Sequence, residues 1–419
     1  MIARLSDRSK KIKPSFTLEM TSKVAKLRSQ GVDVINFSAG QPDFNTPKNI
    51  INAATKAMDS GLTKYTSGSG MIELREAICN KLANENCVSA NINQVLVSNG
   101  EKQSLYLACQ ALFQQNDEVL IFTPYWVSFP EFVILAEATP IFVKTKIDKN
   151  FEPDFDDLKS KITPNTKGMI INTPSNPTGG VWSKEAIKKS LKIASDNNII
   201  VISDECYERL VFNSYHEISE KINLEEKINA EILTCMSMSK TYAMTGWRIG
   251  YTYGNEEIVS AMSKIQGQST SCANSIAQAA SIEALSGDQS KVEAMIGQFK
   301  KRRDLMVSLL NSLPDISCKM PGGAFYAFPS FEKYLGRKIK NKTINNSFDL
   351  SNLFLSEANI ATVPGDGFGA SGFVRFSFAT SEKNIVEGLS RIKDLFCLLY
   401  TSDAADEGLG VDLGGRRII

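Results

Sequence analysis

The sequence predicts an α/β protein with a large domain built on a mostly parallel β-sheet between helices and a smaller α+β domain. Two observations support this prediction. Between residues 94 and 253, short apolar segments alternate with segments whose apolar residues recur at helical spacing, which is typical of parallel strands joined by helices. After about Gly287 the alternation stops and a long charged helical pattern begins, which indicates a second, smaller unit.

The elements follow in chain order. Helices are expected at 101–115 and 183–198, where apolar residues repeat every three or four positions. Strands are expected at 94–98, 117–122, 140–144, 167–174, 199–205, 231–237 and 248–254. The smaller unit begins with the charged helix 290–313, and continues with "GGAFYAFPS", a helix at 345–359, a strand at 372–379 and the amphipathic segment 382–396.

These patterns divide the chain into four parts. We expect an N-terminal segment at 1–48 that packs with the small domain, a large domain at 49–287 and a small domain at 288–396. In the last part, 397–419, "CLLYTSDAADE" and "VDLGGRRII" resemble translated sequencing-adapter ends and lack an amphipathic pattern. We interpret this part as a non-native tail and exclude it from the fold prediction.

The composition argues against several classes of function. With 47 basic and 46 acidic residues and no basic stripe, the chain has no electrostatic footprint for nucleic acid or a membrane surface. No apolar segment is long enough to span a bilayer or follows the basic N-terminus as a signal peptide would, so we expect a cytoplasmic protein with small-molecule partners. The eight scattered cysteines indicate reduced core residues and no metal site, and His216 is expected at the surface or in a loop.

The polar residues that follow the apolar segments indicate the chemistry, because such sheets bind ligands beyond the carboxyl ends of their strands. Lys240 follows the segment 231–237 in a turn of small residues. Most lysines are solvated surface charges. A second cation nearby helps to keep a lysine amine neutral, and a neutral amine can form a Schiff base with a carbonyl group. Arg248, with the hydroxyls of Ser237 and Ser239, would bind an anion such as phosphate. A carbonyl-reactive amine beside a phosphate site indicates pyridoxal phosphate as the cofactor.

This cofactor makes further demands on the sequence. Its ring nitrogen needs a carboxylate, and Asp204 ends a predicted strand, although a turn or helix-capping aspartate would look the same. Tyr207 and Asn176 could donate to the phenolic oxygen, although "NTPSNPTGG" would also suit a plain tight turn. The segment "SNGEK" offers amides at a helix start to the phosphate. Trp126 could stack on the ring or simply pack in the core.

Together these segments resemble the class I aminotransferases of fold type I, in particular bacterial aspartate aminotransferases of the aspartate/prephenate subgroup. The resemblance extends from "LSDRSKKIKPS" to "RIKDLF" and rests on "FSAGQPDFNTP", "KYTSGSGMIELREAI", "PYWVSFPE", "NTPSNPTGG", "SDECYE", "SMSKTYAMTGWRIGY" and "VRFSFATSE". It implies a seven-stranded sheet in a three-layer sandwich and a homodimer with shared active sites. It also implies ping-pong transfer of an amino group from L-aspartate to 2-oxoglutarate, which gives oxaloacetate and L-glutamate through a Schiff base on Lys240 and pyridoxamine phosphate.

The resemblance implies a role for each candidate residue. Lys240, Asp204 and Tyr207 are the catalytic residues, as the Schiff-base lysine, the partner of the ring nitrogen and a donor to the phenolic oxygen. Arg375 grips the substrate α-carboxylate. The other implied contacts are Asn176 and Trp126 at the ring and the substrate; Gly100, Glu101, Lys102, Ser237, Ser239 and Arg248 at the phosphate; Tyr65 at the phosphate of the neighbouring subunit; and Gly40 at the substrate.

The amino-acid preference is left open. Lys102 resembles a lysine that recognises the distal carboxylate of aspartate or glutamate, although it could be solvated in the first helical turn. Lys13 aligns with a basic residue linked to prephenate acceptance. Gln41, where glutamate is common, and a serine-rich loop at 66–70 depart from the usual pattern.

Three alternatives remain. A prephenate or aromatic aminotransferase, or a carbon–sulfur lyase, would keep Lys240 without needing Lys102. A regulatory ligand-binding module of aminotransferase shape would need a DNA-binding extension, which this sequence does not contain.

Overall fold

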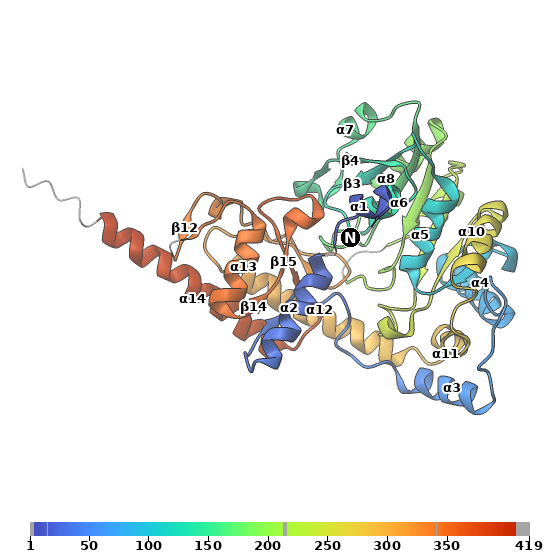
Figure 1. Ribbon diagram of the computed structural model, residues 1–419, viewed down its shortest axis with the longest axis horizontal. Helices are drawn as coiled ribbons and strands as arrows, with labels where there is room; N and C mark the ends of the chain where they lie inside the picture. Colours follow the sequence, from blue (N-terminus) through green and yellow to red (C-terminus); the bar gives the residue numbers. More distant parts are fainter. Residues whose placement is uncertain (1–3, 15, 213–215, 341, 408–419) are drawn as a thin grey trace, which may run out of the picture.

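A seven-stranded sheet forms the centre of the large domain, in the order β2-β10-β9-β8-β7-β3-β4 (Figure 1). This computed structural model describes the chain except residues 1–3, 15, 213–215, 341 and 408–419, and only the backbone of 397–407. Strand β10 is antiparallel to β2 and β9, and the other pairings are parallel, so the predicted mostly parallel sheet is confirmed. The strands are β2 (Val95–Ser98), β3 (Glu118–Phe122), β4 (Thr139–Val143), β7 (Thr166–Asn172), β8 (Ile200–Asp204), β9 (Ile232–Ser237) and β10 (Gly250–Tyr253).

Helices cover both faces of this sheet because its strands are apolar on both sides. In β8, Ile202 packs in one core cluster with the helices α5, α6 and α10, whereas its neighbour Val201 packs in another with α8 and α9. Both residues are fully buried. Consecutive strand residues point to opposite faces, so one strand supplies both cores. The helices are α5 (Glu101–Leu112), α6 (Phe129–Leu135), α7 (Phe155–Ser160), α8 (Lys184–Asp196), α9 (Ser219–Glu225) and α10 (Glu256–Ser269).

A third group of helices packs at the β2–β10 side of the sheet: α3 (Lys48–Asp59), α4 (Ile72–Asn86) and α11 (Ser275–Ser286). Local signals fix where such helices begin. The side chain of Asn274 accepts a hydrogen bond from the amide of Ala277 and so caps α11, and Ser183 caps α8 in the same way.

The small domain is an α+β unit, as predicted. Its sheet has the order β11-β16-β15, with β11 (Tyr326–Ala327), β15 (Val363–Pro364) and β16 (Val374–Ser377), and all pairings are antiparallel. Helices α12 (Ser290–Asn311), α13 (Ser347–Ala358) and α14 (Glu382–Glu407) pack around an aromatic-rich core. Strand β14 (Ile360–Ala361) follows α13. Strands β12 (Lys338–Ile339) and β13 (Lys342–Thr343) form a short pair in the same domain. A second short pair, β5 (Thr145–Lys146) with β6 (Glu152–Pro153), belongs to the large domain.

The N-terminal segment contacts both domains. Helix α1 (Asp7–Lys11) lies beside α6 of the large domain, whereas helix α2 (Phe16–Ser29) lies beside β15 of the small domain. Strand β1 (Ile35–Asn36) pairs in parallel with β14. The domain boundaries drawn from the sequence stay a prediction.

Some sequence expectations need correction. His216 lies in a loop, but its side chain is only 1% exposed and its Nε2 lies 2.7 Å from Oε2 of the fully buried Glu205. Cys87 is exposed at the end of α4, whereas most described cysteines are buried and all are free thiols. Helix α14 continues to Glu407, into the segment excluded from the fold prediction (Figure 1). No helix in the described part of the chain is both long and apolar enough to cross a membrane.

Candidate active site

A cavity of about 430 Å³ opens at the carboxyl ends of the central strands. It is bounded by strand ends of the large domain, by β16 of the small domain and by the N-terminal segment, which are distant in sequence. The predicted residues that line it are Gly40, Glu101, Lys102, Trp126, Asn176, Asp204, Tyr207, Ser237, Ser239, Lys240, Arg248 and Arg375. The fold therefore gathers most of the candidate residues around one space.

Lys240 lies just past the end of β9, where the chain turns through small residues into the cavity. Its Nζ donates a hydrogen bond to the backbone oxygen of Gly40, and lies 5.8 Å from the centre of the Phe325 ring. Within the described chain, Lys240 forms no ion pair with an acidic side chain. The hydrogen-bond partner of this amine is therefore a neutral backbone oxygen. A ligand with a reactive carbonyl group could take its place beside the amine.

Asp204 ends β8 and is 4% exposed. Its Oδ1 accepts a hydrogen bond from the amide of Cys206 at 3.1 Å. Burial raises the pKa of Asp204 to about 6, against the opposing effects of hydrogen bonds from neighbouring groups. A cation or an N–H donor that binds in the cavity would stabilise the ionised form of this buried carboxyl group.

The start of α5 and Arg248 form a second part of the site. Gly100 precedes α5 with φ of 83°, and a Cβ there would lie 2.3 Å from Nη2 of Arg248. A Cβ on Gly250 would lie 2.2 Å from the amide nitrogen of Glu101. Glycine at position 100 lets the helix start approach Arg248 closely, and glycine at position 250 lets it pack against the start of β10. The first amides of a helix have no partner within it, so these amides and Arg248 suit an anion.

Arg375 on β16 is the most deeply buried cation of the site, at 1% exposure. Its Nη1 donates to Oδ1 of Asn176 at 2.8 Å and its Nη2 to the backbone oxygen of Ser38 at 3.0 Å. Its Nε is buried and has no hydrogen-bond partner among the residues that the structure describes, and the guanidinium lies 4.4 Å from the centre of the Tyr326 ring. Burial lowers the pKa of Arg375. The partners of this charge are neutral, so an incoming anion would be strongly favoured.

Aromatic groups form the remaining walls. The hydroxyls of Tyr207 and Tyr326 lie 3.0 Å apart, and burial raises the pKa of Tyr207 well above its ordinary value. Trp126 packs edge-on against Phe129. The Nζ of Lys102 lies 5.2 Å from the centre of the Trp126 ring, and burial, followed by the charge of Arg248, lowers the pKa of this lysine.

Three predicted residues do not line the cavity. Gly100 immediately precedes α5, whose first residues, Glu101 and Lys102, do line the cavity. Tyr65 is 89% exposed, so its predicted contact is not made within one chain. The side chain of Lys13 is exposed, and only its backbone amide reaches the large domain, where it donates to Glu131 at 3.1 Å.

Gln41, which the sequence analysis singled out for its departure from the usual pattern, also lines the cavity. The lining residues that the sequence analysis did not identify are Thr17, Leu18, Thr21, Asn36, Ser38, Ala39, Asn172, Cys206, Thr245 and Tyr326. Asn172 and Cys206 flank recognised positions and could have been found from them. Tyr326, in an apolar run of the small domain, and Thr17, on a helix of the N-terminal segment, had no local signal.

Comparisons with known proteins give a consistent result. The model of the family described as aminotransferase class I and II matches residues 32–392. The chain is 40% identical to an aspartate aminotransferase of Bacillus sp. (strain YM-2), over 93% of this chain and 98% of the relative. It is 41% identical to a probable aspartate/prephenate aminotransferase of Aquifex aeolicus, over 93% and 98%. The structure is similar to that of aspartate aminotransferase from Thermus thermophilus with maleate, with a TM-score of 0.88, 36% identity and coverage of 94% and 100%.

Proposed function

The chain belongs to the class I and II aminotransferases, and on that premise we propose that it transfers the amino group of L-aspartate to 2-oxoglutarate with pyridoxal phosphate as cofactor. The observation that carries this proposal is one cavity that contains both a lysine amine and a buried guanidinium, neither of which has an acidic partner in the described part of the chain. The first suits an aldehyde, and the second suits the carboxylate that every amino acid carries.

The residues present fit the proposed cofactor. The buried carboxyl group of Asp204 suits the ring nitrogen, and the hydroxyl of Tyr207 and the amide of Asn176 suit the phenolic oxygen. The close approach of Arg248 to Gly100, which a Cβ would block, leaves the helix start available to a phosphate group. The hydroxyls of Ser237 and Ser239, the amides of Glu101 and Lys102 and the ring of Trp126 complete the proposed contacts.

In the proposed reaction, bound pyridoxal phosphate supplies an aldehyde and a ring that withdraws electrons from the substrate α-carbon. Arg375 binds the α-carboxylate and so orients the α-carbon toward Lys240, with the backbone of Gly40 and the side chain of Asn176 beside it. Lys240 would hold the cofactor through its amine, and the same amine, once free, would move the α-proton of the substrate. The carboxyl group of Asp204 would hold the ring nitrogen.

Aspartate is the proposed donor because Lys102 lies at the cavity wall beside Trp126, where a second carboxylate could reach it. The similar Thermus thermophilus enzyme was solved with maleate, which is a four-carbon dicarboxylate. Prephenate is a second candidate substrate because relatives carry the name aspartate/prephenate aminotransferase. The exposed side chain of Lys13 would have to move to contribute to that specificity.

Two measurements test the function. Borohydride reduction followed by peptide mass mapping is expected to fix the cofactor on Lys240, and Lys240→Ala should remove the label while Lys102→Ala keeps it. Addition of L-aspartate to the full chain is expected to change the visible absorption of the cofactor and release oxaloacetate, with prephenate tested as an alternative acceptor. A chain that binds no pyridoxal phosphate contradicts the whole proposal. A cofactor whose absorption does not change when L-aspartate is added contradicts only the proposed substrate.

We also propose that the enzyme is a homodimer in which Tyr65 reaches the phosphate site of the partner subunit. Its 89% exposure in a single chain supports this assignment. Mixing inactive Tyr65→Ala and Lys240→Ala chains under refolding conditions should restore activity, because one site of each mixed dimer would then contain both native residues. No recovery, from variants that do form mixed dimers, would contradict the shared site.

A further inference from the structure

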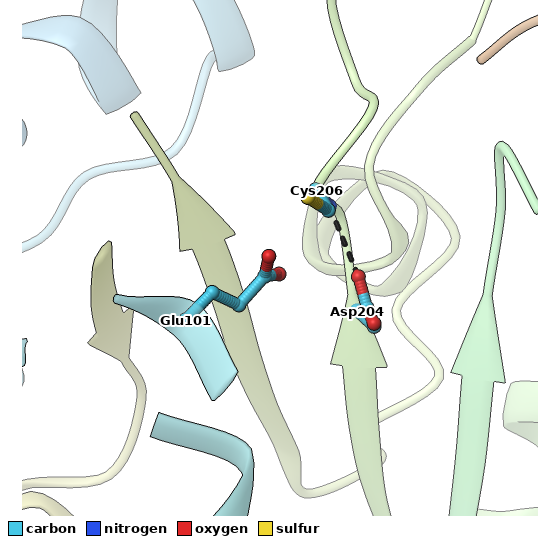
Figure 2. Close-up of side chains that lie close together, drawn as sticks. All are labelled: Glu101, Asp204 and Cys206. Carbon is cyan, nitrogen blue, oxygen red and sulfur yellow. Dashed lines mark hydrogen bonds between the residues drawn. The ribbon is translucent and has the colours of Figure 1, made fainter. Parts of the chain in front are cut away.

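The side chain of Glu101 lies where the sequence suggested only a backbone contact. Glu101 begins α5 and is 6% exposed, and its carboxyl group points toward the end of β8 (Figure 2). Carboxyl oxygens of Glu101 and Asp204 and the Sγ of Cys206 lie within 4.8 Å of one another. The Oε1 of Glu101 is buried and has no hydrogen-bond partner among the described residues. Two buried acidic side chains therefore lie close together at the cavity wall.

The cations nearby do not neutralise both groups. Lys240 donates to the backbone of Gly40, Arg248 donates through Nη1 to the backbone oxygen of Thr245 at 2.9 Å, and Lys102 lies over Trp126. The thiols of Cys206 and Cys235 also face Glu101, and burial raises the pKa of both well above its ordinary value, so these thiols add no charge.

Two carboxylates this close in a buried site cannot both ionise easily. Burial, followed by the charge of Asp204, raises the pKa of Glu101 well above its ordinary value of 4.5. Burial also raises the pKa of Asp204, to about 6. Asp204 accepts a hydrogen bond from the amide of Cys206, whereas Oε1 of Glu101 has no partner among the described residues, so Glu101 is the better place for a proton that the pair shares.

We propose that Glu101 is a positioning residue that stays protonated at neutral pH and offers its proton to Asp204, so that the pair carries a single negative charge. The terminal torsion of glutamate is soft, so the carboxyl group of Glu101 can turn toward that of Asp204, an oxygen of which lies within 4.8 Å. The role, which rests on the proposed function, is to hold the carboxylate of Asp204 in place and to limit the negative charge beside the ring nitrogen to one. Glu101 acts through Asp204 and does not touch the substrate.

The first test measures thermal unfolding of the full chain without cofactor, from about pH 5 to pH 8, for the wild type and Glu101→Gln. The native wild type keeps a proton that the unfolded chain releases above pH 4.5, so its stability falls as pH rises through this range. Glutamine keeps the size and cannot titrate. The melting temperature of the wild type should therefore fall relative to that of Glu101→Gln as pH rises.

The matched control is Glu257→Gln, which changes an exposed glutamate in the first turn of α10. Its melting temperature should follow that of the wild type at every pH. A constant difference between the wild type and Glu101→Gln across the range would overturn the proposal, because it would mean that Glu101 is already ionised in the native state.

Infrared spectroscopy tests the protonation directly. At about pH 7 the wild type should show a protonated carboxyl band that is absent in Glu101→Gln. Glu220 is the control, because burial raises its pKa to about 7 and its own band should be equal in the wild type and in Glu101→Gln. The band would be followed by isotope labelling of glutamate in the wild type, so the measurement survives if the variant folds poorly. Absence of the band would overturn the proposal.

A third measurement uses the enzyme loaded with pyridoxal phosphate. Because glutamine is also a neutral donor, the pH midpoint of the visible absorption should be the same in Glu101→Gln as in the wild type. A midpoint displaced by about one unit or more would mean that a charge was removed, which overturns the proposal. If the chain binds no pyridoxal phosphate, the proposed function fails, while the first two tests still decide the protonation state of Glu101.

Discussion

Replacement of Arg375 by lysine gives the sharpest test of how the substrate is held. A guanidinium has five N–H donors, of which Arg375 uses one for Asn176 and one for the backbone of Ser38. Three donors remain, including the unpartnered Nε, and a carboxylate can accept two of them side by side. A lysine ammonium has only three donors, so if it kept both protein contacts it would have one left for the substrate.

The expected loss is therefore one charge-assisted hydrogen bond. Such a bond contributes about 1.5–3 kcal/mol, so kcat/KM should fall about 10- to 150-fold at 0.59 kcal/mol per RT. The assay follows oxaloacetate from L-aspartate through a coupled dehydrogenase, and repeats the measurement with a monocarboxylic amino acid. Both substrates should lose the same factor, because both carry the α-carboxylate.

The matched control is Arg303→Lys, because Arg303 is also 1% exposed but lies outside the cavity. Its kcat/KM should stay within about twofold of the wild type. A loss confined to aspartate in Arg375→Lys would show that Arg375 contacts the distal carboxylate instead. A loss below threefold for both substrates would refute the proposed contact altogether.

Three further predictions follow from other contacts. Lys102→Ala should lower kcat/KM for aspartate about 10- to 100-fold and leave kcat/KM for the substrate alanine unchanged, because only aspartate offers a second carboxylate. An equal loss for both substrates would mean that Lys102 does not bind that carboxylate. Gly100→Ala should weaken pyridoxal phosphate binding at least ~10-fold in a fluorescence titration, since its Cβ would lie 2.3 Å from Nη2 of Arg248, and unchanged binding would contradict the close approach. His216→Ala should lower the free energy of unfolding in urea by about 3 kcal/mol, because it removes a buried partner of Glu205; a change below about 1 kcal/mol would mean that water replaces the ring.

The fold was predictable from the sequence because its strands are short, apolar and separated by helices of regular period. Strands β8 and β9 fall within the predicted segments 199–205 and 231–237, and β7 begins one residue before the predicted segment 167–174. The sequence could not give the strand order, in which β10 inserts between β2 and β9, because pairing between distant strands leaves no local pattern. The burial of His216 was missed for a similar reason, since its partner is a strand-end residue that only the fold brings near.

The candidate site divides in the same way. Asp204, Lys240 and Arg248 could be recognised because each lies at a strand end of the large sheet. Asp204 ends β8, Lys240 follows β9, and Arg248 precedes β10, which is antiparallel to β9. Arg375 was identified only through its resemblance to a known motif. Tyr326 lies in an apolar run, and its contact with Tyr207 joins two domains, so no spacing within either segment could indicate it.

For Glu101 the sequence predicted a contact of the backbone amide only, and the side chain was not considered. The helix start explains the glycine and the amides, and these would be satisfied by almost any residue at position 101. A glutamate there adds an acidic group under a cavity that already contains Asp204, which costs free energy unless one group keeps its proton. A protein can tolerate such a cost where it serves function. A proton held between Glu101 and Asp204 would keep the charge of the pair at a single negative unit beside the ring nitrogen. That link between a structural cost and a fixed charge is what the comparison of Glu101→Gln with the wild type measures.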